Sequence, residues 1–286
     1  MELIVGKTAG FCYGVKKAVD GAREELKRNE TLYGLGEIVH NEEVVKKLEN
    51  LGMRFIENIE EAKGKTIIRA HGIPKQIYEE AKRRQIELKD YTCPKVLNIH
   101  QIAEEYANKG YYIFLLGNKM HPEIVGTLSY CGENKFVIEK EDDTIKALET
   151  LEKSGIKKLL VISQTTYSLE KFYIIEEIIK NKIPRSIELI IKNTICQATE
   201  IRQKETEEMA KKVDSMIVIG GKNSSNTKKL YDIARKYCKM VLLIENETEL
   251  VLDNIKSTDK VGIMAGASTP KESIEKVIEK LKFVSF

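Results

Sequence analysis

The sequence predicts an α/β fold built from three similar units with mainly parallel sheets, arranged as a pseudo-threefold trefoil. Three observations predict it. Short β-rich runs alternate with longer helical patterns along the chain, which is typical of α/β units. Polar or cysteine-containing turns follow many of these runs, and parallel sheets bind ligands beyond the carboxyl ends of their strands. A pattern of cysteine and polar residues also recurs three times at one interval.

The composition limits the possible classes of protein. A chain of 286 residues can form one large or two to three small domains with ample core. Charged residues make up 32% with a net charge of only +3, which argues against nucleic acid as the main partner. No apolar run approaches the roughly 20 residues that span a bilayer. The chain begins with a strand pattern rather than a signal peptide, so we expect a cytoplasmic protein without a membrane segment.

The first third of the chain predicts strands that end at polar turns. Residues 3–5 form a strand, and an amphipathic helix with one buried face follows Cys12. Asn41 is a plausible N-cap for a second helix, because its side chain can accept a hydrogen bond from a free helix amide. Residues 66–69 form a further strand, which ends at His71.

The middle of the chain continues this alternation. The predicted strands are residues 86–91, 111–116, 136–138 and 159–162. Cys93 follows the first of these strands, and Pro94 opens a helix that runs to about residue 109. His121 and Glu123 enter another helix after the second strand. Thr165 follows the last strand of the series.

The last third has the same organisation. The predicted strands are residues 187–191, 216–219, 241–244 and 261–264. Cys196 lies between the first strand and a long helix. Ser224 and Asn226 lie in a polar loop before a helix, where each could also be an ordinary N-cap. Ser268 lies in the loop that enters the final helix.

The intervals between these residues indicate three copies of one unit. An interval of 28 residues separates Cys12 from His40, Cys93 from His121, and Cys196 from Ser224. Four residues before each endpoint lies a glycine: Gly36, Gly117 and Gly220. The next polar strand ends are His71, Thr165 and Ser268. We predict units at residues 13–92, 93–193 and 194–286, with the N-terminal segment 1–12 supplying the missing last strand of the third unit.

Equivalent positions in three repeats favour a shared role for three cysteines. Three thiolates on strand ends could hold three irons of a 4Fe–4S cluster, leaving a fourth iron open as a Lewis acid. Zinc fits less well, because the polar candidates exceed what a closed tetrahedral site uses. Buried structural thiols are the remaining alternative for Cys12, Cys93 and Cys196. Cys131 and Cys238 fall outside the repeat and are expected to be core or surface thiols.

The polar residues of the repeats suit an anionic ligand. Together they would offer donors to a phosphate or diphosphate: His40, His71, His121, Ser224, Asn226 and Ser268. Glu123 could simply complement the dipole of its helix, but beside a cluster and an anion it would be the natural proton donor. His100 lies in the middle of a helix and is expected to be structural.

With these motifs in place, the chain resembles the 4-hydroxy-3-methylbut-2-enyl diphosphate reductases, the LytB-like family of the non-mevalonate isoprenoid pathway. The matching motifs run in order along almost the whole chain: GFCYGV at 10–15, VHN at 39–41, RAHGIPK at 69–75, TCP at 92–94, HPE at 121–123, QTT at 164–166, TICQAT at 194–199, KNSSN at 222–226 and AGAS at 265–268. The resemblance implies a trefoil around one central 4Fe–4S cluster with three cysteine ligands, Cys12, Cys93 and Cys196, and an open fourth iron.

The resemblance also implies the reaction and its partners. The allylic hydroxyl would be removed with two electrons and two protons, giving isopentenyl and dimethylallyl diphosphates. Glu123 would deliver protons, and Thr165 would lie near the hydroxyl. The remaining residues would hold the diphosphate: His40, His71, His121, Ser224, Ser225, Asn226 and Ser268. A ferredoxin- or flavodoxin-type protein would supply electrons, since the chain has no flavin or nicotinamide motif of its own.

Two other readings of the sequence remain open. A zinc- or phosphate-binding module without redox activity would use the same ligand types. A related three-cysteine 4Fe–4S dehydratase would share the three-unit layout, because a fold alone does not determine the substrate. The HPE and KNSSN motifs are what favour the diphosphate.

Overall fold

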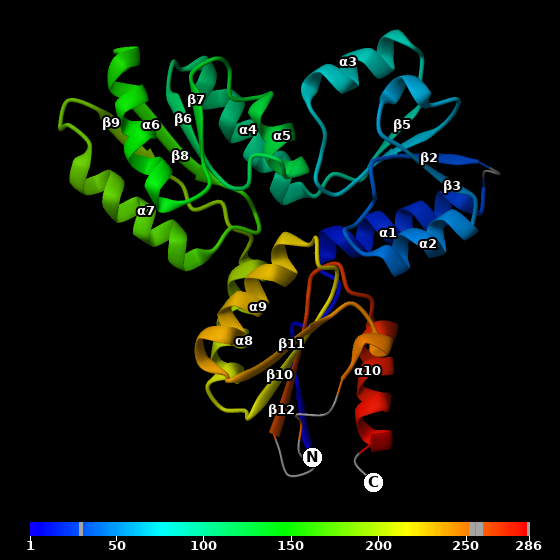
Figure 1. The fold of residues 1–286 in the computed structure, drawn as a ribbon. Coiled ribbons are helices and arrows are strands. Elements are labelled where there is room, and N and C mark those ends of the chain that lie inside the picture. Colours follow the sequence, from blue (N-terminus) through cyan, green and yellow to red (C-terminus); the bar gives the residue numbers. More distant parts are fainter. Residues whose placement is uncertain (29–30, 252–254, 256–259, 285–286) are drawn as a thin grey trace. The chain divides into compact units, whose positions relative to one another are not determined.

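The protein is described here by a computed structural model that covers residues 1–28, 31–251, 255 and 260–284 (Figure 1). Its contacts group the chain into two compact units, each described by itself. The first unit contains residues 1–28, 37–53 and 197–286, and the second contains residues 29–36 and 54–196. The predicted boundaries of three repeats therefore stay a prediction, whereas the sheets themselves can be compared directly.

The second unit contains two four-stranded sheets. One has the order β3-β2-β4-β5, with β3 at Met53–Ile56, β2 at Leu32–Leu35, β4 at Thr66–Ile68 and β5 at Leu88–Asp90. The other has the order β7-β6-β8-β9, with β7 at Lys135–Ile138, β6 at Tyr112–Leu116, β8 at Lys158–Ser163 and β9 at Glu188–Ile191. The pairings with a described register are all parallel.

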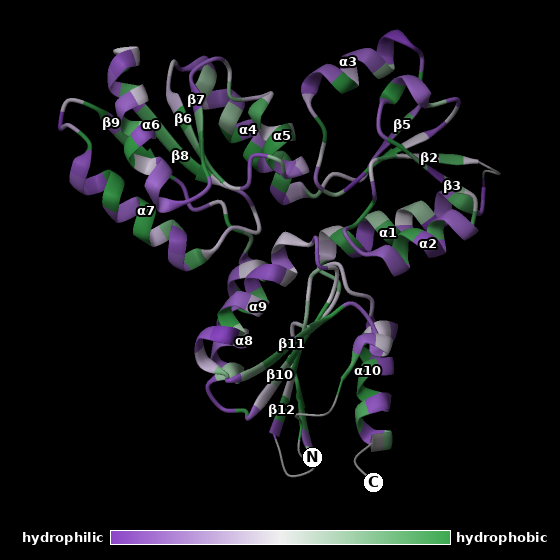
Figure 2. Ribbon diagram, in the orientation of Figure 1, coloured by the Kyte–Doolittle hydropathy of each residue, from purple (hydrophilic) through white to green (hydrophobic). Residues whose placement is uncertain are grey.

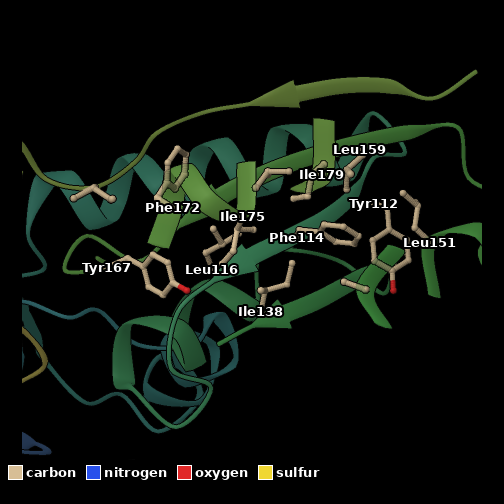
Figure 3. Close-up of a cluster of buried hydrophobic side chains, with 13 residues drawn as sticks. Tyr112, Phe114, Leu116, Ile138, Leu151, Leu159, Tyr167, Phe172, Ile175 and Ile179 are labelled. Atoms are coloured by element: carbon tan, nitrogen blue, oxygen red, sulfur yellow. The ribbon is translucent and has the colours of Figure 1, made fainter. Parts of the chain in front are cut away.

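Helices cover both faces of the sheet that contains β6. They are α4 at Pro94–Asn108, α5 at Pro122–Leu128, α6 at Glu141–Ser154 and α7 at Leu169–Lys182. Alternate residues of β6 separate the two cores, because successive side chains point to opposite faces. Phe114 belongs to the same core as Phe172 of α7 (Figure 3), whereas Ile113 belongs to the core that contains Ile99 of α4 and Ile124 of α5. The shorter helices α3 at Lys75–Arg83 and η1 at Ile59–Glu61 pack on the other sheet.

The first unit contains the third sheet, with the order β1-β12-β10-β11. Its strands are β1 at Glu2–Val5, β12 at Lys260–Ala265, β10 at Ser215–Ile219 and β11 at Met240–Ile244. The N-terminal strand β1 pairs in parallel with β12, from Glu2 beside Lys260 to Val5 beside Ile263. The predicted pairing of this segment with the last part of the chain is therefore seen in the structure.

The described part of the first unit also contains five α-helices. They are α1 at Tyr13–Leu26, α2 at Glu42–Asn50, α8 at Gln197–Ala210, α9 at Ser225–Tyr237 and α10 at Lys271–Val284, with a 3₁₀ turn η2 at Glu247–Glu249. Val277 of α10 packs on one face of the sheet with Ile217, whereas Leu230 of α9 and Met209 of α8 pack on the other with Val218. Figures 1 and 2 show this sheet between its helices: its strands are mostly hydrophobic, and the helices are of mixed hydropathy.

All three sheets share one topology. Ordered along the chain, each repeat places its second strand at an edge, then its first, its third and its fourth. In the first unit, β1 takes the place of the fourth strand, as β5 and β9 do in the other sheets. Strands β2 and β3 were not expected from the sequence, because Gly34 interrupts the apolar run of one and Arg54 interrupts that of the other.

Candidate active site

Three of the five cysteines lie at equivalent turns after the fourth strand of each sheet. Cys12 and Cys93 are the N-cap residues of α1 and α4, and Cys196 immediately precedes α8. Each cysteine amide donates to a carbonyl two residues beyond the end of the third strand. The acceptors are Ala267 for Cys12 at 3.1 Å, Ala70 for Cys93 at 3.0 Å, and Thr165 for Cys196 at 2.9 Å. An equivalent backbone hydrogen bond therefore holds each of the three turns.

The surroundings of these cysteines differ from those of the other two. Cys12, Cys93 and Cys196 are half-buried, are not disulfide-bonded, and lie at the start of a helix. Cys131 and Cys238 are buried in apolar cores, where their thiols donate to backbone carbonyls. Burial raises the pKa of Cys131 to about 12. They are core thiols, one of the two expected settings.

In the second unit, Glu123 is a buried acid joined to Thr165. Glu123 is 1% exposed, and its two carboxylate oxygens accept from the amide and the hydroxyl of Thr165, both at 2.6 Å. Burial raises the pKa of Glu123 to about 7, although the two hydrogen bonds from Thr165 lower it in part. A carboxyl group that titrates near neutral pH can both hold and release a proton there.

Two histidines extend this cluster toward Cys93. His121 is the N-cap of α5, and its Nδ1 atom accepts the Glu123 amide at 3.2 Å. The rings of His71 and His121 meet edge to face, with 5.2 Å between their centroids. The Ala70 carbonyl, next to His71, accepts the Cys93 amide, and the Thr165 carbonyl accepts the Cys196 amide. A series of contacts therefore joins these two cysteine turns through His71, His121 and Glu123.

In the first unit, His40 lies against two loops of the third sheet. The Ser268 hydroxyl donates to the His40 carbonyl oxygen at 3.3 Å. A Cβ atom on Gly221 would lie 2.3 Å from the same oxygen, so only glycine permits this approach of the two backbones. The Gly221 carbonyl in turn accepts the Ser224 amide at 2.9 Å. Residues distant in sequence therefore meet at the carboxyl edge of this sheet.

The start of α9 carries the remaining predicted residues. Ser224 is its N-cap and accepts the Thr227 amide at 3.4 Å, and Ser225 is half-buried at its first position. Asn226 is 3% exposed, and neither its side-chain oxygen nor its nitrogen has a hydrogen-bond partner among the residues that the structure describes. Because a buried amide without partners is costly, Asn226 fits a ligand that supplies them.

The hydrogen bonds align the repeats slightly differently from the sequence intervals. Equivalent glycine amides donate to the last residue of each second strand: Gly36 to Ile56, Gly117 to Ile138 and Gly220 to Ile244. The helix caps that follow are Asn41, His121 and Ser224, so the first loop is one residue longer and His40 precedes its cap. Thr165 likewise aligns with Ala70 and Ala267, one residue before His71 and Ser268.

His100 has the structural environment expected for it. It is 3% exposed and stacks on Tyr130 with 4.3 Å between ring centroids. Within the described part of the chain, neither of its ring nitrogens has a hydrogen-bond partner. Burial lowers its pKa to about 4, so the ring is neutral at pH 7. It packs against Gly72, the residue after His71.

The residues present fit a thiolate-bound metal cluster together with an anionic ligand. Three half-buried thiols that are not disulfide-bonded are a suitable type of donor for Fe–S ligation. The two buried cysteines are unsuitable as a fourth ligand, because their thiols are enclosed in separate cores. The unpartnered amide of Asn226 adds a polar position for the anion.

Known proteins are similar to this chain over almost its whole length. Residues 3–282 match the family model described as LytB protein. The 4-hydroxy-3-methylbut-2-enyl diphosphate reductase of Caldanaerobacter subterraneus subsp. tengcongensis is 44% identical over 288 residues, covering 99% of this chain and 97% of the relative. The enzyme of the same name from Clostridioides difficile is 39% identical, covering 99% of each chain.

Solved structures of such enzymes share the fold. The structure of the E-1-hydroxy-2-methyl-but-2-enyl-4-diphosphate reductase from Plasmodium falciparum is similar with a TM-score of 0.90 at 33% identity, covering 98% of this chain and 88% of that one. A second solved structure, of an (E)-4-hydroxy-3-methyl-but-2-enyl diphosphate reductase, has a TM-score of 0.71 at 37% identity, covering 99% and 100% of the two chains.

Proposed function

Since this chain belongs to the LytB protein family, we propose that it reduces (E)-4-hydroxy-3-methylbut-2-enyl diphosphate to isopentenyl and dimethylallyl diphosphates. The allylic carbon–oxygen bond breaks, two electrons and two protons are taken up, and the hydroxyl leaves as water. The chain would thus catalyse the last step of the non-mevalonate route to isoprenoid precursors. The relatives' shared enzyme name supports the substrate and the pathway.

The observation that carries the proposal is the pairing of Glu123 with Thr165. A buried carboxyl group with a pKa of about 7 can protonate a leaving hydroxyl at neutral pH. The Thr165 carbonyl also accepts the Cys196 amide, so one residue connects the acid to a cysteine turn. Glu123 would act as the proton donor, and the Thr165 hydroxyl would hold the carboxylate once the proton has left.

Cys12, Cys93 and Cys196 would hold one 4Fe–4S cluster with a fourth iron free of protein ligands. When bound, such a cluster supplies electrons one at a time and a Lewis-acidic iron. The equivalent backbone hydrogen bonds at the three cysteine turns support a common role. Bringing the three turns to one cluster requires the trefoil arrangement that the repeats predict.

The diphosphate would be held by side chains from several loops. The proposed ligands are His40, His71, His121, Ser224, Ser225, Asn226 and Ser268. With its Nδ1 atom accepting the Glu123 amide, a neutral His121 carries its proton on Nε2 and can donate it to an anion. Asn226 would gain the partners that its buried amide lacks.

Electrons would come from another protein, because the sequence has no flavin or nicotinamide motif. A small ferredoxin- or flavodoxin-type carrier fits this need, and the expected setting is the cytoplasm. Among the described residues, no helix is both long enough and apolar enough to cross a membrane.

The test is anaerobic purification followed by turnover with a chemical reductant and the hydroxylated diphosphate. We expect a brown protein with about four irons per chain and formation of both isoprenoid diphosphates. A colourless protein that takes up zinc but not iron would refute the reductase and favour a non-redox module. Cluster binding with no turnover of this substrate would instead favour a related dehydratase.

Replacement of Glu123 tests the proton donor separately. We expect Glu123→Gln to retain iron and substrate binding but lose at least about 100-fold in turnover, the usual contribution of a positioned acid. Exposed Glu133, in the same unit, provides the matched control Glu133→Gln. A turnover of Glu123→Gln equal to that of the control would remove Glu123 from the proton path.

A further inference from the structure

A buried arginine on α8 is bound to the loop that leads to Cys12. Arg202 is 4% exposed, and its Nε and Nη2 atoms donate to the Thr8 carbonyl at 2.8 and 2.6 Å. Nη2 also donates to the Gly10 carbonyl at 2.8 Å. One planar guanidinium thus binds two carbonyl groups of the same loop, which a single ammonium group could not match in geometry.

A second residue of α8 binds the same loop through its amides. Glu205 accepts the Lys7 amide at 2.6 Å and the Thr8 amide at 3.0 Å. It also accepts a hydrogen bond from the Thr8 hydroxyl. Arg202 and Glu205 lie three positions apart, so they project from neighbouring turns of one helix face. Between them they bind both the donors and the acceptors of the loop.

Backbone hydrogen bonds also join this loop to the third sheet: the Gly6 amide donates to Ile263 at 2.9 Å, and the Cys12 amide donates to Ala267 at 3.1 Å. Residues 6–12 connect β1 to α1 without regular structure, and Gly10 has a φ of +102° that most residues avoid. Between these two hydrogen bonds, the backbone of Lys7, Thr8 and Gly10 is bound by side chains of α8. Two residues of extended chain span at most about 7 Å, so the Gly10 carbonyl lies close to Cys12.

We propose that Arg202 and Glu205 are positioning residues that hold the Cys12 loop in the conformation required for cluster ligation. The inference rests on the proposed function, since it assumes that Cys12 is a cluster ligand. The helix that carries Arg202 and Glu205 also begins directly after Cys196. Residues of α8 therefore bind the Cys12 loop, and the start of α8 adjoins the Cys196 turn. The positive charge of Arg202 would favour the reduced, more negative form of the cluster, and the carboxylate of Glu205 would oppose it.

The chain offers a graded set of variants. Arg202→Met removes both the hydrogen bonds and the charge. Arg202→Lys keeps the charge but not the planar set of guanidinium donors. Glu205→Gln keeps the shape of the side chain but not the carboxylate. Matched controls lie on the exposed side of the same helix: Lys204→Met and Glu208→Gln. Thermal unfolding of the iron-free proteins by circular dichroism identifies any variant that fails to fold, in which case the milder Arg202→Lys and Glu205→Gln decide.

The measurement is the rate of iron loss to a chelator from anaerobically reconstituted protein, with the reduction potential of the cluster as a second readout. We expect Arg202→Met to lose iron roughly 10- to 100-fold faster than wild type, the usual effect of losing an outer-shell partner. Its potential should fall, and Arg202→Lys should restore part of both properties. The control variants should behave as wild type.

The outcomes separate this inference from the proposed function. If the wild-type chain binds no cluster, the proposed function fails. If wild type binds the cluster but folded Arg202→Met and Glu205→Gln lose iron at the wild-type rate with an unchanged potential, the positioning role is refuted. Faster iron loss in these two variants but not in the controls supports it.

Discussion

The buried carboxyl group of Glu123 makes the stability of the protein depend on pH in a defined direction. In the folded chain its pKa is about 7 because of burial, whereas its ordinary value is 4.5. Between these two pH values the folded state keeps a proton that the unfolded state releases. Stability therefore falls as pH rises through this window, and it is lowest, as far as this group is concerned, above pH 7.

The magnitude follows from the difference between the two pKa values. At about 1.4 kcal/mol per pH unit, it amounts to roughly 3 kcal/mol of stability lost between pH 4.5 and pH 7. Glu123→Gln should abolish this loss, because the amide stays neutral. Its oxygen can still accept the Thr165 amide, and its nitrogen can donate to the Thr165 hydroxyl, so both hydrogen-bond positions remain filled.

Urea unfolding of iron-free protein at pH 5, 6, 7 and 8 measures the effect. The chain has no tryptophan, so far-ultraviolet circular dichroism is the suitable probe. Glu123→Gln should gain stability over wild type from pH 5 to about pH 7 and little more by pH 8, while Glu133→Gln should show no such gain. Thr165→Val removes one hydrogen bond that lowers the Glu123 pKa, so its transition should move to higher pH. A difference between Glu123→Gln and wild type that does not change with pH would refute the reasoning.

Three further predictions concern the scaffold and are measured by thermal or urea unfolding. Asn41→Ala removes the side chain that caps α2 and should cost about 1 kcal/mol, whereas Asn41→Asp should retain most of it. Gly72→Ala should destabilise more than Gly110→Ala, since both glycines have positive φ but only at Gly72 would the new Cβ lie 2.9 Å from His100; equal effects would contradict this. Phe114→Ala should cost about 3–5 kcal/mol because the ring is fully buried.

The fold class was predictable from the sequence because the repeated features are local. Apolar runs ending in polar turns identify strands of parallel sheets, and the interval from Cys93 to His121 spans one helix, one strand and one loop. The third repeat lacks a strand after its last helix, which pointed to the N-terminal segment. The N-terminal strand β1 pairs with β12 in the structure. An open sheet edge presents unpaired backbone groups with which a further strand can form hydrogen bonds.

The contacts of the site were not predictable in the same way. Nothing local to Glu123 indicates that its carboxylate meets Thr165, because 42 residues separate them and burial decides the pKa. Arg202 and Glu205 look like ordinary charges on a polar helix. Their role becomes visible only when the loop at Thr8 is seen to bind them, since buried arginine implies partners that the sequence alone does not name.

The small disagreement between intervals and hydrogen bonds bears on how the repeats divide their roles. A sequence interval counts residues, whereas a hydrogen bond between strands marks an equivalent structural position in each sheet. One inserted residue therefore shifts the sequence alignment of the residues that follow it. The insertion before Asn41 lets an asparagine cap the helix, which leaves His40 outside it with its carbonyl bound by Ser268. In the second repeat, His121 must cap its helix itself. The Nδ1 atom of His121 is therefore used as the acceptor of its own helix cap, whereas the helix after His40 is capped by Asn41.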